Sequence, residues 1–376
     1  MRLVQVGICG LGTVGSGTIN LLQQNAALIN PRSNCEIVIS QVGARRDNPN
    51  CDTSSLNVSR DIFDVAKNPD IDIVVELIGG TTVARDLVMT ALEHGKHVVT
   101  ANKALIAVHG DELFQLANAK GVSIMFEAAI AGGIPIVKAL REGLAGNQVH
   151  WVAGIINGTS NFILSEMESA GNRGFEEVLK QAQELGYAEA DPTFDVEGID
   201  AAHKLTILSS LAFGVPLNFA AMYTEGISEI TVEDIGYADE LGFKIKHLGI
   251  ARCQNGQLEM AVHPSFVPAT AILSQIDGVQ NAVLVCGDAA GEILCTGAGA
   301  GAGPTGSAVV SDLIDLVQGT SSSGSLGGRS SALKALPVRP AAEVVSGYYL
   351  RISVEDQPGV MSAVTSILAR RTISLD

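Results

Sequence analysis

Residues 3–17 read LVQVGICGLGTVGSG, in which an apolar run leads directly into Gly10, Gly12 and Gly15, spaced as GxGxxG. A segment with helical apolar periodicity follows over residues 13–24. In a strand–turn–helix unit the first glycine permits the tight turn, the second lets backbone approach a pyrophosphate, and the third allows close helix–strand packing. A structural glycine turn is the alternative, but this context favours a dinucleotide site.

The same alternation of apolar runs and helical segments continues to about residue 135. Four further runs are EIVISQV, IDIVVELI, HVVTA and VSIMFEA, at residues 36–42, 71–78, 97–101 and 122–128. Runs that are apolar without a period of two are typical of parallel strands covered on both faces. The pattern therefore predicts an α/β, Rossmann-type dinucleotide-binding domain over residues 1–135, with a late helix at about 304–319 returning to it.

Beyond residue 135 the pattern changes to longer helices mixed with sheet-like runs. Residues 136–303 are expected to form an α+β catalytic and oligomerisation domain, with helices that include residues 199–213 and 232–248. A Gly/Ser-rich linker is predicted for residues 320–340. Residues 341–376 then read as a strand (YYLRISV), a turn and a helix, which is too little chain for an independently folding domain.

Composition narrows the class of protein. The 376 residues carry 24 Lys and Arg against 40 Asp and Glu, a formal charge of −16, which argues against nucleic-acid and anionic-membrane partners. The six cysteines form no CxxC pair, so a reducing, cytoplasmic location is expected. No apolar run is long enough to span a membrane, and the N-terminus does not resemble a signal peptide.

The end of the second predicted strand bears on the choice of coenzyme. An acidic residue at this point binds the ribose 2′-hydroxyl of NAD, but the sequence has Ala44, Arg45 and Arg46. Two guanidinium groups suit a 2′-phosphate, which favours NADP. Asp47 follows directly and keeps NAD use open as an alternative.

The segment ELGYAEADPTFDVEGIDAAHKLTIL, residues 184–208, combines several carboxylates with one lysine. Asp200 and Lys204 are four residues apart on a predicted helix and therefore share a face. A solvated ion pair is the simpler interpretation, but the rest of this helix is apolar, which favours a buried or cleft position. An ammonium there can stabilise and protonate the alkoxide that forms when a hydride reaches a carbonyl. Lys103 follows a predicted strand and so lies at the sheet edge where ligands bind, unless it is a surface lysine.

Several ordered segments together resemble homoserine dehydrogenases. They include GICGLGTVGSG, GKHVVTANKAL, EAAIAGGIPI, GIINGTSNFIL and ELGYAEADPTFDVEGIDAAHKL, and they extend over nearly the whole chain. The resemblance implies reversible conversion of L-aspartate 4-semialdehyde to L-homoserine with NAD(P)H, on the route to threonine and methionine. It also implies a homodimer or homotetramer.

The resemblance assigns roles by position. Lys204 would be the proton donor and acceptor, Lys103 a second essential lysine, and Glu189 the partner of the substrate ammonium. Around them, the substrate cleft would contain Asp195, Asp200, Asn157, Gly158, Thr159 and Tyr187. The coenzyme would contact Gly12, Thr13, Val14, Arg45, Lys103 and Gly303. Backbone carbonyls would hold a structural Na⁺ at Glu127, Ile130, Gly132 and Ile134.

The last segment is similar to the first half of an ACT domain, a module that binds amino acids for feedback control. The sequence departs from the family there, because it reaches Asp376 as a second strand begins, which puts threonine inhibition in doubt. Two alternatives remain open from the residues. One is a sensor that binds nucleotide and amino acid without catalysis, and the other is a different amino-acid dehydrogenase.

Overall fold

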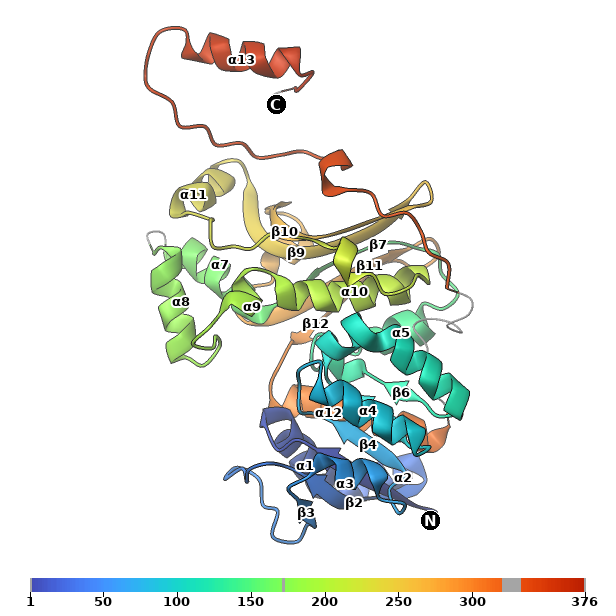
Figure 1. Cartoon of the computed structure of the whole chain (residues 1–376). Coiled ribbons are helices and arrows are strands. Elements are labelled where there is room, and N and C mark those ends of the chain that lie inside the picture. The colour runs from blue at the N-terminus through green and yellow to red at the C-terminus, as the bar shows by residue number, and fades with distance from the viewer. Residues whose placement is uncertain (1, 171–172, 320–332, 375–376) are drawn as a thin grey trace. The chain divides into compact units, whose positions relative to one another are not determined.

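The computed structural model describes residues 2–170, 173–319 and 333–374, and it contains two six-stranded sheets (Figure 1). The chain divides into a large unit that ends at Val344 and a small unit formed by residues 345–376. Both sheets belong to the large unit. Among the helices of the described residues, none has the length and apolar character needed to cross a bilayer.

The first sheet is parallel throughout, with the strand order β3-β2-β1-β4-β5-β6. Its strands are β1 (Arg2–Cys9), β2 (Cys35–Gly43), β3 (Val58–Ser59), β4 (Ile73–Glu76), β5 (His97–Thr100) and β6 (Ile124–Met125). This is the order of doubly wound dinucleotide-binding folds, in which ligands bind where the order reverses, between β1 and β4. The predicted Rossmann-type fold is confirmed.

Helices cover both faces of this sheet. One face packs against α1 (Thr13–Gln24), α2 (Ala26–Ser33) and α12 (Ala302–Gln318), and the other against α3 (Ile62–Lys67), α4 (Val83–Glu93) and α5 (Lys103–Lys120). In β4, Ile73 and Val75 belong to the core beneath α1, whereas Val74 belongs to the core beneath α4. Because both faces of β4 are covered, its Ile73, Val74 and Val75 are all apolar and buried.

The late helix returns to the first domain. It is α12, and it packs along α1 in the lower part of Figure 1, although nearly 280 residues separate them. A Cβ on Gly17 would lie 2.2 Å from the carbonyl oxygen of Ala302, so the second turn of α1 and the start of α12 approach closely. The glycine-rich stretch before α12 is therefore brought beside the GxGxxG turn.

The second sheet has the order β12-β11-β7-β9-β10-β8 and is mainly antiparallel. Its strands are β7 (Val149–Ile155), β8 (Tyr223–Thr224), β9 (Phe243–Gln254), β10 (Gln257–Pro268), β11 (Gln280–Gly287) and β12 (Gly291–Ala298). The long apolar helix α10 (Ile199–Phe213) lies between this sheet and α5 (Figure 1). The shorter helices are α6 (Ile136–Lys138), α7 (Gly158–Ala170), α8 (Phe175–Glu184), α9 (Thr193–Val196) and α11 (Val232–Glu240).

One predicted helix was wrong over half its length. The helix expected over residues 232–248 ends at Glu240, a turn follows at residues 241–242, and residues 243–248 belong to β9. Gly242 adopts a φ of 80° and donates its N–H to the carbonyl oxygen of Asp239, which turns the chain out of the helix. Tertiary pairing then decides the structure, because β9 is the central partner of both β7 and β10.

The segment after α12 is described in part. Residues 320–332 of the predicted linker lie outside the described residues, whereas residues 333–340 run beside the start of β10. Arg339 donates its N–H to the carbonyl oxygen of Leu258 at 2.8 Å and pairs with Glu259 at 2.7 Å. Within residues 345–374 the structure has one helix, α13 (Val360–Arg370), and no strand. The expected strand YYLRISV is therefore wrong, because the described residues of this unit supply no partner for it.

Candidate active site

The three glycines form the turn between β1 and α1. Gly10 has a φ of 111°, and a Cβ there would lie 2.5 Å from the carbonyl oxygen of Leu77. A Cβ on Gly15 would lie 2.0 Å from the carbonyl oxygen of Gly10, so the helix can start this close to the strand only with glycine. A Cβ on Gly12 would meet nothing within 4 Å, which leaves space for a phosphate beside the first turn of α1.

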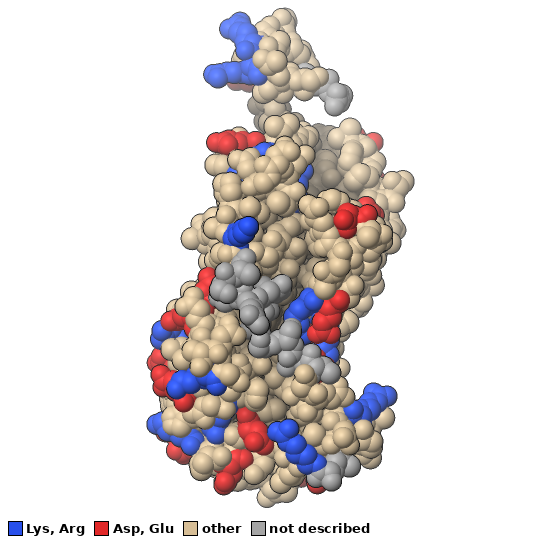
Figure 2. Space-filling view, turned by 90° about the vertical axis from the view of Figure 1, so that its right-hand side faces the viewer, with Lys and Arg blue, Asp and Glu red and all other residues tan. Residues whose placement is uncertain are grey.

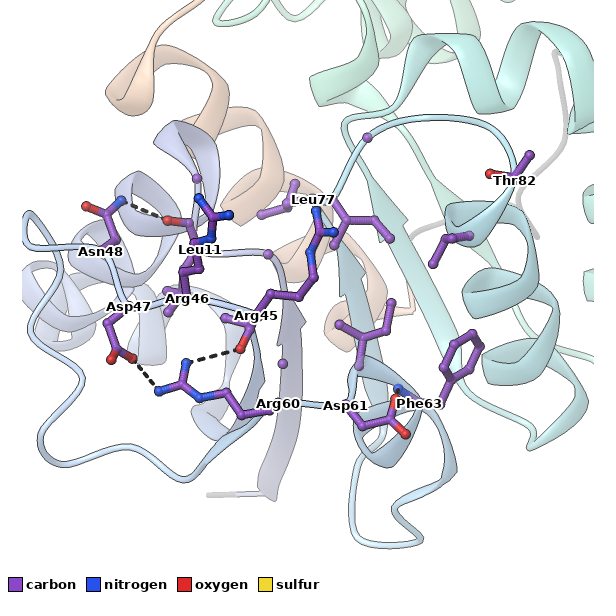
Figure 3. A pocket seen from close by; sticks show the side chains of 18 of the residues that line it. Leu11, Arg45, Arg46, Asp47, Asn48, Arg60, Asp61, Phe63, Leu77 and Thr82 are labelled. Carbon is purple, nitrogen blue, oxygen red and sulfur yellow. Dashed lines mark hydrogen bonds and ion pairs between the residues drawn. The ribbon is translucent and has the colours of Figure 1, made fainter.

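A cavity of about 920 Å³ opens beside this turn (Figure 3). Four of the residues that the sequence analysis assigned to the coenzyme line it: Gly10, Gly12, Arg45 and Arg46. Figure 3 shows Arg45 reaching toward Leu77 and Arg46 toward Leu11. The other predicted coenzyme residues lie outside this lining, in the first turns of α1, α5 and α12; they are Thr13, Val14, Gly15, Lys103 and Gly303.

A third arginine, which the sequence analysis missed, lines the same cavity. Arg60 pairs with the carboxylate of Asp47 at 2.8 Å and donates to the carbonyl oxygen of Ala44 at 3.2 Å (Figure 3). Asp47 is thereby turned toward Arg60. Arg60 stands in a different segment from Arg45, and only the pairing of β2 with β3 brings the two segments together.

The predicted carboxylate–lysine pair is buried at the start of α10. Lys204 Nζ lies 2.6 Å from Asp200 Oδ2 and donates at 2.7 Å to the carbonyl oxygen of Ile156, the residue that follows β7. The two residues are 8% and 3% exposed, so the solvated alternative is wrong. Asp200 lies in the first turn of α10, where the helix dipole also favours a negative charge.

Lys103 reaches the same carboxylate from the other domain. It is the first residue of α5, and its Nζ lies 3.0 Å from Asp200 Oδ1. Each oxygen of Asp200 thus holds one ammonium. One carboxylate between two lysines joins the edge of the parallel sheet to the second domain, and the alternative of a simple surface lysine is excluded.

The two lysines differ in electrostatic environment. Burial lowers the pKa of Lys204, even though Asp200 opposes the shift. Burial alone would lower the pKa of Lys103 too, but the charges of Asp200, Asp195 and Glu189 outweigh it and raise the pKa. Burial alone would raise the pKa of Asp200, yet the two ammoniums hold it well below its usual range.

The remaining predicted substrate residues surround this pair. Asn157 donates to Asp195 Oδ1 at 2.8 Å and to Asp200 Oδ2 at 2.9 Å, and Asp195 has a pKa raised by burial and by Asp200. Thr159, in the first turn of α7, donates to the carbonyl oxygen of Tyr187 at 2.7 Å. Gly158 begins that helix. Glu189 is exposed, and its charge contributes to the raised pKa of Lys103.

An aromatic stack that was not predicted from the sequence begins beside Lys103. Phe194 lies 5.8 Å from Lys103 Nζ, measured to the ring centroid, and stacks on His203 at 5.5 Å. His203 also stacks on Phe219 at 4.2 Å. Phe194 lies among the carboxylates of the quoted segment, but Phe219 follows α10, so only the folded chain reveals the stack.

Comparison with known protein families identifies this arrangement. Residues 10–127 match the model of the NAD-binding domain of homoserine dehydrogenase, and residues 135–314 match the model of homoserine dehydrogenase itself. Together the two matches contain the glycine turn, both lysines and the carboxylates. The chain belongs to the homoserine dehydrogenase family. It is an oxidoreductase with a nucleotide-coenzyme domain, and the expectation drawn from the sequence is confirmed.

Individual homoserine dehydrogenases are similar over the full chain. The protein of that name from Pseudomonas aeruginosa is 56% identical, covering 100% of this chain and 88% of its own. The one from Neisseria gonorrhoeae is 48% identical with the same two coverages. A crystal structure of the Thiobacillus denitrificans enzyme is 49% identical, with a TM-score of 0.93 over 100% of this chain and 88% of that one.

The backbone stretch that the homoserine dehydrogenase resemblance assigned to Na⁺ forms a buried turn. Ala131 and Gly132 have consecutive φ angles of 51° and 53°. Within the described hydrogen bonds, none ends on the carbonyl oxygen of Ile130 or Gly132. The carboxylate of Glu127 accepts the N–H groups of Val137 and Lys138, both at 2.9 Å, so its side chain is already engaged. In the described ranges no cluster of three His, Cys, Asp or Glu suits a metal.

Proposed function

We propose that this enzyme interconverts L-aspartate 4-semialdehyde and L-homoserine, with Lys204 as the proton donor and acceptor and Lys103 as a fixed cation. The shared carboxylate of Asp200 supports this division, because it holds both ammoniums within 3.0 Å while their pKa values shift in opposite directions. Groups whose environments separate their pKa values in this way take different roles. Beside these residues, a bound nicotinamide coenzyme would supply or accept the hydride.

The lowered pKa of Lys204 makes its ammonium a better proton donor than an ordinary lysine. In reduction it protonates the oxygen of the former aldehyde, and in oxidation the neutral amine takes the proton from the hydroxyl of homoserine. Its contacts with Asp200 and the Ile156 carbonyl orient Nζ in both directions. Lys103 keeps its charge, because its pKa is raised, and stabilises negative charge near the reacting oxygen.

The carboxylates beside the lysines suit an amino-acid substrate. Glu189 is exposed and carries a charge that Lys103 senses, so we assign it to the substrate ammonium. Asp195 is held by Asn157 next to Asp200 and supports the same network. Thr159 fixes the Tyr187 backbone, two residues before Glu189.

We infer that NADP is preferred to NAD. Strand β2 ends in Gly43 with no carboxylate, and Arg45, Arg46 and Arg60 line the cavity that follows. Guanidinium groups bind phosphate in bidentate fashion. Asp47, the residue that kept NAD use open, is paired with Arg60. An archaeal homoserine dehydrogenase that is 25% identical, with a TM-score of 0.71, has been crystallised in complex with NADPH.

The turn at residues 127–134 fits a monovalent cation. Hard cations prefer oxygen ligands, and the buried carbonyls of Ile130 and Gly132 are free of the described backbone hydrogen bonds. We propose that they hold Na⁺ together with the carbonyls of Glu127 and Ile134. The ion would have a structural function, because the turn adjoins the first residues of α12 through the packing of Gly133 on Pro304.

We further propose a homodimer or homotetramer that forms through the second sheet. The face of that sheet opposite α10 carries the half-buried apolar side chains Trp151, Ala153, Ile250 and Leu294. On the face shown in Figure 2, acidic and basic side chains are mixed over the first domain.

All six cysteines are unpaired, which supports a reducing, cytoplasmic setting. There the enzyme would supply homoserine for threonine and methionine synthesis.

Steady-state assays of the purified enzyme test the proposal. We expect homoserine-dependent formation of reduced coenzyme, with a higher kcat/KM for NADP than for NAD. Other amino alcohols of similar size serve as controls for substrate identity. Equal activity with any of them would point to a different amino-acid dehydrogenase, and a higher kcat/KM for NAD would contradict the proposed coenzyme preference.

A further inference from the structure

A buried carboxylate lies between the coenzyme cavity and Lys103 and has no assigned role. Glu76 is the last residue of β4, at the carboxyl edge of the parallel sheet, and is 0% exposed. Within the described ranges, no Lys or Arg forms an ion pair with it. A buried carboxylate without a cation is costly and is kept only where hydrogen bonds hold it.

The hydrogen bonds of Glu76 join two loops. Oε1 accepts the N–H groups of Ile78 at 2.9 Å and Gly79 at 3.1 Å, and both of these residues line the coenzyme cavity. Oε2 accepts the hydroxyl of Thr100, the last residue of β5, at 2.5 Å. One carboxylate therefore ties the wall of the cavity to the end of the strand that leads to Lys103.

The chain of contacts continues into helix α5. Thr100 Oγ1 accepts the N–H of Asn102 at 3.0 Å. Asn102 is the N-cap of α5: its Oδ1 accepts the N–H of Leu105 at 3.0 Å, and its Nδ2 donates to the carbonyl oxygen of Gly80 at 2.7 Å. Lys103 follows directly as the first residue of the helix. Asn102, the residue before Lys103, is therefore bonded both to Thr100 and to the loop that contains the cavity-lining Gly79.

We propose that Glu76 and Thr100 are positioning residues that fix the start of α5. They thereby hold the Lys103 ammonium in its place between the coenzyme and Asp200. The inference rests on the proposed role of Lys103. The long lysine side chain has several rotatable bonds, so its ammonium keeps one position only if the backbone below it is fixed. Misplacement of a reacting group by about 1 Å costs about a hundredfold in rate.

The link between Thr100 and Asn102 can be broken without disturbing the cavity wall. Thr100→Val keeps the shape of the side chain but removes the hydroxyl, while Glu76 retains its bonds to Ile78 and Gly79. We expect kcat for homoserine oxidation to fall about ten- to hundredfold. The dissociation constant for NADPH, from its fluorescence, should change less than about threefold, since the wall is intact.

Two further variants separate positioning from a general loss of structure. Thr100→Ser restores the hydroxyl and should return kcat to within about threefold of the unaltered enzyme. Thr206→Val makes the same change at a 1% exposed threonine whose hydroxyl, among the described residues, donates to the carbonyl oxygen of Ala202 in the same helix, so kcat should stay within about twofold. Thermal unfolding of every variant shows whether a lower kcat follows from a smaller folded fraction.

Two results would show that Thr100 does not position Lys103. A folded Thr100→Val enzyme with kcat within about twofold of the unaltered one, or a Ser variant as slow as the Val variant, would overturn the inference. If Thr100→Val does not fold, Asn102→Asp takes its place, because it keeps the cap oxygen for Leu105 but loses the donor to Gly80; the same thresholds apply. Absence of homoserine oxidation in the unaltered enzyme would contradict the proposed function instead.

Discussion

Replacement of Asp200 by Asn removes the charge that holds the two lysines together while keeping the shape of the side chain. In the native structure one oxygen of Asp200 lies 2.6 Å from Lys204 Nζ and the other 3.0 Å from Lys103 Nζ. The substitution leaves two ammoniums beside one neutral amide. Because Lys204 is 8% exposed, water cannot replace the lost counter-ion, and the proton on Lys204 becomes less favourable.

The magnitude follows from the distances. Charges 2.6 Å apart, as in the Lys204–Asp200 pair, attract by about 6 kcal/mol at an effective dielectric constant of about 20. This is an upper limit, since both groups also lost hydration on burial. Loss of one partner of a buried pair costs about 3–5 kcal/mol of folding stability. Because Lys204 can release its proton and so leave no unpaired charge, we expect a loss of about 3 kcal/mol.

The pH dependence of homoserine oxidation measures the change at Lys204. Oxidation needs the neutral amine, so the rate rises with pH as Lys204 loses its proton, and in the native enzyme this rise begins below the pH of an ordinary lysine. In Asp200→Asn the rise should move further down by about one pH unit or more, and kcat on the plateau should fall about ten- to hundredfold.

Asp191→Asn is the matched control, because Asp191 is exposed and its hydrogen bonds in the described structure come from Thr193 alone. Its pH profile and kcat should equal those of the unaltered enzyme. If the profile of a folded Asp200→Asn enzyme stayed in place or moved to higher pH, the carboxylate would not control the lysine that transfers the proton, and the reasoning would be refuted.

Three further predictions follow from the coenzyme cavity and the second sheet. Arg45→Ala should raise KM for NADP about tenfold or more and leave KM for NAD nearly unchanged, because a charged hydrogen bond contributes about 1.5–3 kcal/mol; equal effects on both coenzymes would argue against a 2′-phosphate contact. Gly12→Ala should fold normally yet weaken NADPH binding, measured by fluorescence titration. Gly15→Ala should lower the melting temperature, measured by calorimetry, because its Cβ would lie 2.0 Å from the Gly10 carbonyl oxygen. The reverse pattern would contradict both assignments. Trp151→Arg should shift the mass measured by light scattering toward the monomer, and an unchanged mass would place the subunit interface elsewhere.

The sequence predicts the first domain well because its signals are local. An apolar strand, three glycines and an amphipathic helix specify the β1–α1 unit, and continuous apolar runs identify the other buried strands. Strand β9 was missed because the end of α11 depends on Gly242, and because the preference of residues 243–248 is decided by their pairing with β7 and β10. Local propensity alone does not contain that pairing.

The residues of the site also divide into those that a local sequence pattern predicts and those that depend on packing between distant segments. Asp200 and Lys204 were predictable, since they share one face of an apolar helix. The contact of Lys103 with Asp200 depends on the packing of α5 against α10, which no local pattern specifies. Arg60 and Phe219 were missed for the same reason, because each joins its partners from a distant segment. The different pKa shifts of the two lysines also required the folded structure, since burial sets one and neighbouring charges set the other.

The most direct test of the account is the kcat of Lys204→Met, a change that keeps the length and apolar character of the side chain but removes the proton. If Lys204 transfers the proton, kcat for homoserine oxidation falls by about 10²- to 10⁴-fold, the usual contribution of a positioned acid–base group. The NADPH dissociation constant should stay within about threefold, because Lys204 does not line the coenzyme cavity. A folded variant that retains kcat within about tenfold of the unaltered enzyme would contradict the assignment of Lys204 as the proton donor and acceptor.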